Sequence, residues 1–91
     1  MAKQTKQTKA RPLQQFSINK FRSKRKELGL GQLKLSNLTK EFAENLSKPE
    51  LRIGQQTIAG WELGKVPTIN RLAVAAAVMG VTPAYFLEGS S

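Results

Sequence analysis

The sequence predicts an all-α fold of five short helices, and three observations lead to it. Apolar residues recur at spacings of three and four between residues 17 and 89, with no useful stretch of the alternation that indicates β-strands. The apolar segments are separated by Gly, Pro, Ser and Thr at positions typical of helix starts and ends. A chain of 91 residues with 40% hydrophobic content is long enough for one small core and too short for two.

The first residues differ in composition from the rest of the chain. The stretch MAKQTKQTKARP is polar, repeats Lys-Gln-Thr and offers no apolar face to a core. We therefore expect residues 1–16 to form a flexible basic N-terminal arm and residues 17–89 to form the folded domain.

The first helix is expected to begin after Ser17, whose hydroxyl can accept a hydrogen bond from a backbone N–H of the first turn. Gly29 is a suitable end, because glycine adopts the left-handed backbone of a helix terminus without steric cost. The residues that should share the inner face follow at helical spacing: Ile18, Phe21, Arg25 and Leu28.

A second helical stretch follows Leu30-Gly31-Gln32, and Ser36 is a suitable N-cap for it. Pro49 disfavours helical backbone at the residue before it, so this helix should end between Ser47 and Glu50. Its apolar positions recur at helical spacing: Leu35, Leu38, Phe42 and Leu46.

The third helix is expected over residues 55–62, which make about two turns. Ile58 and Trp61 lie three residues apart and therefore point the same way. We interpret both as core residues that face away from Gln55. The alternative, that they are exposed and stack against the bases of a nucleic acid, is less favoured.

The C-terminal part contains start and stop signals for two further helices. Thr68 can cap a helix from Ile69 to Met79, rich in small alanines, and Gly80 should end it. Thr82-Pro83 repeats the start signal, which predicts a last short helix over residues 84–87.

The net charge of +9 is concentrated in the first third of the chain. Residues 1–30 hold nine Lys or Arg against one Glu, whereas residues 31–91 hold six against five. The positive field therefore originates in the arm and the first helix, and a polyanion is the expected partner.

The composition leaves little for catalysis or for a cofactor. There is no cysteine and no histidine, and all six acidic residues are glutamates. We expect no enzyme, no metal or other cofactor and no small-molecule substrate, because neither a nucleophile with a base nor a metal-binding set is visible. No apolar run approaches the ~20 residues of a membrane helix, so we expect no membrane partner and a cytoplasmic protein.

Three segments together resemble a known family. They are FRSKRKELGLGQ from Phe21 to Gln32, GQQTIAGWELGK from Gly54 to Lys65, and MGVTPAYFLEG from Met79 to Gly89. In this order they resemble the repressor and Cro proteins of lambdoid phages, within the wider Xre-type helix-turn-helix family. The resemblance implies a five-helix lambda-repressor-like DNA-binding domain, with residues 55–62 as the recognition helix in the major groove. It also implies association with the nucleoid of a bacterial or phage-infected cell.

The middle of the chain departs from this family, because 23 positions separate Gln32 from Gln55 where about a dozen are usual. Either Gln32 opens the second helix and an insertion follows it, or residues 38–46 form that helix and the insertion is split around it. We prefer the second alternative, because Phe42, Ala43 and Leu46 then fill the apolar positions. The turn before the recognition helix is lengthened in that case, a feature that also resembles POU-specific domains.

Gln55 and Gln56 are the predicted base contacts. A side-chain amide presents an acceptor and two donors in one plane, which matches N6 and N7 of adenine in the major groove. Thr57 could contact a phosphate or a thymine methyl. Gly60 stands where related repressors can carry a third reading side chain, so less direct readout is expected there.

The family resemblance also implies supporting contacts. Glu62 should pair with Arg25 of the first helix and act as a structural brace for the recognition helix. Lys65 matches a position that meets phosphate in related repressors. The full set of predicted phosphate contacts is Gln32, Lys65, Lys40 and Arg22.

The leading functional hypothesis is a sequence-specific regulator of transcription, of the repressor kind, that binds double-stranded DNA as a homodimer. Candidate dimer surfaces are the alanine-rich fourth helix and residues 85–87. Two alternatives stay open: the antitoxin of a toxin–antitoxin pair with autoregulatory DNA binding, and a nonspecific nucleic-acid binder that uses its basic arm.

Overall fold

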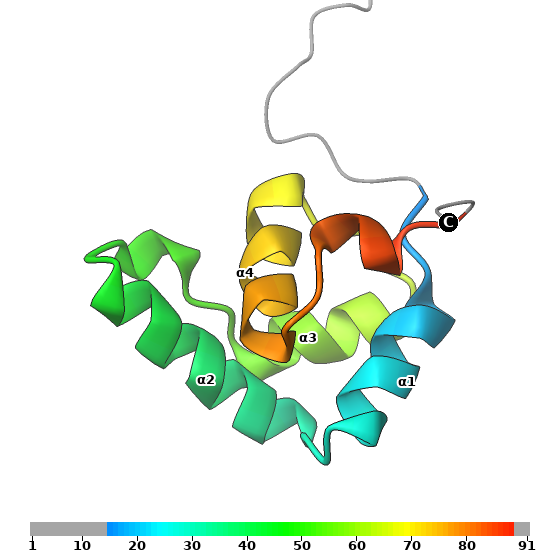
Figure 1. Ribbon diagram of the computed structural model, residues 1–91, viewed down its shortest axis with the longest axis horizontal. Helices are drawn as coiled ribbons and strands as arrows, with labels where there is room; N and C mark the ends of the chain where they lie inside the picture. Colours follow the sequence, from blue (N-terminus) through cyan, green and yellow to red (C-terminus); the bar gives the residue numbers. More distant parts are fainter. Residues whose placement is uncertain (1–14, 89–91) are drawn as a thin grey trace, which may run out of the picture.

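The computed structural model describes residues 15–88, which form four α-helices and two 3₁₀ turns and no strand (Figure 1). In order, these elements are α1 (Ile18–Glu27), α2 (Gln32–Asn45), η2 (Pro49–Leu51), α3 (Gln55–Glu62), α4 (Ile69–Met79) and η3 (Pro83–Phe86). The all-α class is confirmed. The count of five helices is wrong, since the last one is the 3₁₀ turn η3. Residues 1–14 of the expected arm lie outside the described residues, as does Gly89.

The elements pack so that α3 is held between its neighbours. In Figure 1, α4 lies in front of α3, and α2 and α1 stand on opposite sides of this pair. α3 packs against both α1 and α2, and η3 packs against α1 and α4. The direction of α3 is therefore set by two helices rather than one.

α1 begins and ends as its sequence predicts. The Ser17 hydroxyl accepts a hydrogen bond from the backbone N–H of Lys20 at 3.2 Å, and Gly29 follows the helix end with φ +71°. Phe21 and Arg25 are buried on the inner face. The prediction for Leu28 is wrong: it caps the helix end and points to solvent, 44% exposed.

Phe16 belongs to the core, which moves the expected boundary of the arm. Its ring lies 5.7 Å from Phe21 and 6.1 Å from Trp61, centroid to centroid. Its backbone forms an isolated antiparallel bridge with Leu87, and the neighbouring Ser17 N–H donates to the Phe86 carbonyl at 2.7 Å. Ending the arm at residue 16 was therefore wrong by at least one residue, because Phe16 is buried.

α2 begins at Gln32, six residues before the helix of the preferred alternative. The structure thus has Gln32 opening the second helix, as in the first alternative. Ser36 is not its N-cap, a role held by Gly31, but a buried interior residue whose hydroxyl donates to the Ile53 carbonyl at 2.8 Å. Leu46 lies beyond the helix end and is exposed, so it does not fill an apolar position of the core.

The end of the connection over residues 46–54 is fixed to α2 through Ile53. Ile53 is buried, and its backbone N–H donates to the Thr39 hydroxyl at 3.2 Å while its carbonyl accepts from Ser36. Upstream, Ser47 has a left-handed backbone (φ 58°), and Pro49–Leu51 forms η2. A long connection consequently delivers the start of α3 to a defined place beside α2.

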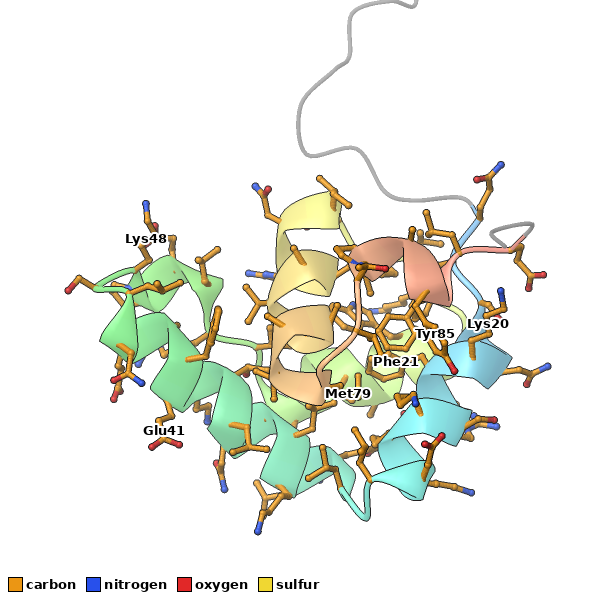
Figure 2. All side chains as sticks on the ribbon, in the orientation of Figure 1. Lys20, Phe21, Glu41, Lys48, Met79 and Tyr85 are labelled. Atoms are coloured by element: carbon orange, nitrogen blue, oxygen red, sulfur yellow. The ribbon has the colours of Figure 1, made fainter. Side chains whose placement is uncertain are left out.

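α4 and η3 close the core. α4 ends at Gly80 with φ 78°, as predicted. Two of its four alanines, Ala75 and Ala76, are buried in the core, whereas Ala77 is exposed. Phe86 is also buried and packs 5.4 Å from Phe21, whereas Tyr85 is exposed beside it (Figure 2). Phe86 is therefore not available as a dimer surface.

Candidate nucleic-acid interface

α3 has an inner side and an outer side. Ile58 and Trp61 are buried against the core, at 0% and 3% exposed, which confirms their interpretation as core residues. Gln55 and Gln56 are exposed at the start of the helix, and Thr57 is half-buried beside them. The first turn of α3 thus presents two neutral amides to solvent. Their contact with bases stays a prediction.

Glu62, the last residue of α3, is bound by a guanidinium of α1. The Arg25 Nε atom donates to Oε2 at 2.7 Å, and Arg25 Nη2 donates to Oε1 at 2.8 Å. Both side chains are at most 10% exposed. This is the bidentate pair that the family resemblance implies, and it joins the end of α3 to the last turn of α1. Arg25 Nη1 also donates to the Leu30 carbonyl at 3.0 Å, which holds the chain leaving α1.

Two further side chains bind the same carboxylate, and neither contact was anticipated. Gln32 Nε2 donates to Glu62 Oε1 at 3.2 Å, and Arg22 Nε donates to the same oxygen at 3.4 Å. Arg22 Nη2 also donates to the backbone carbonyl of Glu62 at 3.1 Å. We call these four residues, Arg22, Arg25, Gln32 and Glu62, the Glu62 clamp.

The clamp changes how Arg22 and Gln32 are understood. Both are predicted to contact phosphate. In the structure, Arg22 Nε and Nη2 and Gln32 Nε2 donate to Glu62, and contact of either side chain with phosphate stays a prediction. The spacing of three between Arg22 and Arg25 places them on one face of α1 and could have indicated a shared partner. Gln32 gave no such signal, because its partner lies 30 residues away in the sequence.

Burial of the Glu62 carboxyl by itself would raise its pKa. Hydrogen bonds from Arg25, Gln32 and Arg22, together with the charge of Arg25, outweigh that effect, so the pKa lies below its ordinary value. The carboxylate is consequently charged at neutral pH and able to hold its three donors.

This lowered pKa predicts that folding stability depends on pH. A carboxylate with a lower pKa in the folded state contributes stability that is complete above the ordinary glutamate pKa of about 4.3 and is lost as the pH falls through the folded pKa. We expect the difference in unfolding free energy between the wild type and Glu62→Gln, measured by urea denaturation, to stay constant from pH 7 to about 4.3 and to shrink as the pH falls further. A difference that stays constant below about pH 4.3 as well would contradict the prediction.

No protein-family model, curated protein or solved structure matches this chain. Within residues 15–88, no helix is long and apolar enough to cross a membrane. The same part of the chain holds no group of three or more acidic, His or Cys side chains arranged for a metal ion. The candidate site therefore rests on its own geometry.

Past the end of α3, Lys65 folds back over the helix. The Lys65 N–H donates to the Gly60 carbonyl at 2.9 Å, and the Gly64 N–H donates to the Trp61 carbonyl at 3.3 Å. This pair of bonds, with Gly64 at φ +119°, is the Schellman arrangement of a helix end. A β-carbon added to Gly60 would lie 3.2 Å from Lys65 Cδ, so the lysine stem lies across the glycine.

A polar hollow of about 350 Å³ adjoins this contact, bordered by Gln56, Thr57, Trp61, Lys65 and Val66. Leu63 caps the same helix and is 86% exposed. Apart from the buried Glu62, residues 55–63 carry no charged side chain. The outer side of α3 thus offers amides and small or apolar groups, with Lys65 as a cation at its border.

Exposed cations lie on the helices around α3. Lys40 is exposed on α2, as its predicted phosphate contact requires, and Lys34 is exposed six residues before it on the same helix. The described residues hold eleven Lys or Arg against six Glu. This part of the chain is therefore moderately basic without the arm.

Proposed function

We propose that this chain is a sequence-specific regulator of transcription that binds double-stranded DNA, with α3 as its recognition helix. In this proposal the fold is a lambda-repressor-like helix-turn-helix domain, and the connection over residues 46–54 is its lengthened turn. Gln55 and Gln56 contact base edges, Thr57 contacts a phosphate or a thymine methyl, and Lys40 contacts phosphate. Two copies bind half-sites about one helical turn apart.

The observation that carries the proposal is the pair of exposed amides on a helix held at both ends. At its start, α3 follows Ile53, whose backbone is bonded to Ser36 and Thr39 of α2. At its end, Glu62 is held by α1 and by the first residue of α2. A helix positioned in this way can present the same side chains to every duplex, which base discrimination requires.

The dimensions and charge of the domain agree with this role. An α-helix with its side chains is about 10–12 Å in diameter, which the major groove of B-DNA, about 12 Å wide, admits. The neutral outer side of α3 suits base edges, while cations on other elements suit phosphates. The positive charge of residues 1–30 would attract DNA of any sequence.

Selection of bound duplexes from a random pool tests the proposal. The wild type is expected to enrich one site with a preference of at least ~10³ over random duplex. Gln55→Ala and Gln56→Ala should each lose the preference at one or two positions, by roughly 1–3 kcal/mol for each lost contact. Both side chains are exposed, so melting temperatures should stay close to that of the wild type.

Two results would contradict the proposal. Equal affinity for all duplexes would identify a nonspecific binder. Variants that select the wild-type site with unchanged stringency would show that the glutamines do not contact bases.

A further inference from the structure

The position of Lys65 differs from that of a freely extended surface lysine. Its backbone N–H donates a hydrogen bond to the carbonyl of Gly60, five residues earlier. Its Cδ and Cγ atoms would lie 3.2 and 3.8 Å from a β-carbon added to Gly60. A β-carbon at residue 60 would therefore require the lysine stem to shift by a few tenths of an ångström. The stem is thus laid along the helix surface instead of pointing away from it.

Gly60 also determines the side of α3 that Lys65 covers. Gly60 follows Gln56 by four residues, so the two share one face of the helix. Lys65 and Gln56 border the same hollow, together with Thr57. The lysine stem therefore lies on the face that carries a predicted base contact.

We infer that Lys65 is a specificity-determining residue that contacts a base edge, rather than a phosphate anchor. An ammonium group offers only donors, and the major-groove edge with two acceptors is that of guanine, at N7 and O6. Lys65 would then prefer guanine beside the position contacted by Gln56. This inference rests on the proposed function, and it explains why a glycine occupies the middle of α3 despite a cost of roughly 1 kcal/mol relative to alanine.

Lys65→Met tests the inference, because methionine keeps an unbranched apolar stem over Gly60 and removes only the ammonium group. In selection from a random pool, the wild type should prefer guanine at one position next to that lost in Gln56→Ala. Lys65→Met should lose this preference, by about 5- to 150-fold, and keep the other positions.

Lys40→Met is the matched control, since Lys40 is exposed on α2. It should bind all duplexes more weakly, with an unchanged selected site and a salt dependence reduced by about one unit of slope. If Lys65→Met behaves like this control, Lys65 contacts phosphate and the inference is wrong. If the wild type itself selects no site, the proposed function fails and the inference fails with it.

A second measurement needs no DNA. Nuclear Overhauser contacts between the Lys65 δ-methylene protons and the Gly60 α-protons are expected in the free protein. They should persist in Lys40→Met. Their absence would overturn the inference, because the stem would not lie across the glycine.

Discussion

Glu62→Ala is expected to lower the unfolding free energy by about 3–5 kcal/mol, the usual cost of removing one partner from a buried ion pair. Arg25 would keep its charge while only 10% exposed, with no carboxylate to receive its two hydrogen bonds. Arg22 and Gln32 would lose an acceptor as well, but both are half-exposed and can turn to water. Urea denaturation, followed by circular dichroism, measures the change.

Two variants make this prediction specific. Glu27→Ala removes the exposed glutamate that pairs with Lys24 at 3.2 Å within α1, and it should change stability by less than about 0.5 kcal/mol. The double variant Arg25→Met with Glu62→Leu should recover much of the loss, because replacing both partners leaves no unpaired buried charge. A cost below about 1 kcal/mol for Glu62→Ala would show that the clamp does not support the fold.

The same variant bears on DNA binding. In a domain that stays folded, α3 would lose its attachment to α1 and to the start of α2, so affinity for the selected site should fall. DNA affinity measured without urea and at low temperature, where the variant is folded, separates this effect from global unfolding. Unchanged affinity together with an unchanged melting temperature would refute the role of Glu62 as a brace.

Phe21→Ala is expected to cost about 3–5 kcal/mol, through lost burial and the cavity left behind. Phe21 is fully buried, and its ring lies 5.4 to 5.7 Å from the rings of Phe16, Trp61 and Phe86. These three partners come from the segment before α1, from α3 and from η3, so the ring joins both ends of the described chain to the candidate recognition helix. The single tryptophan of the protein reports unfolding by its fluorescence.

Leu28→Ala is the control for this substitution, since Leu28 lies at the end of the same helix and is 44% exposed. It should cost well under 1 kcal/mol. Equal losses of unfolding free energy in the two variants would mean that the cluster of Phe16, Phe21, Trp61 and Phe86 is not the centre of the core.

Local patterns predicted the elements whose signals lie within a few residues. The start of α1 at Ser17 and its end at Gly29 follow from cap chemistry, as does the end of α4 at Gly80. The predicted start of α2 after Ser36 was wrong. Serine is a common N-cap, but the Ser36 hydroxyl donates to the carbonyl of Ile53, 17 residues away.

In the candidate site, too, some features could be predicted from the sequence and others could not. The exposure of Gln55 and Gln56 and the burial of Ile58 and Trp61 follow from helical spacing. The pairing of Arg25 with Glu62 was expected from the family resemblance. The attachment of Gln32 to the same carboxylate could not be expected from either, since it requires the end of α3 and the start of α2 to meet.

The sequence by itself determined the helical class, most helix ends and the two sides of α3, because periodicity and cap chemistry act over one or two turns. Only the tertiary structure decided that Phe16 joins the core, that Arg22 and Gln32 bind Glu62, and that the stem of Lys65 lies across Gly60. The physical reason is the separation of the contacting residues along the sequence. The first two contacts join elements distant in the sequence, and the third depends on the backbone turn at Gly64, so none is encoded in the spacing of apolar residues.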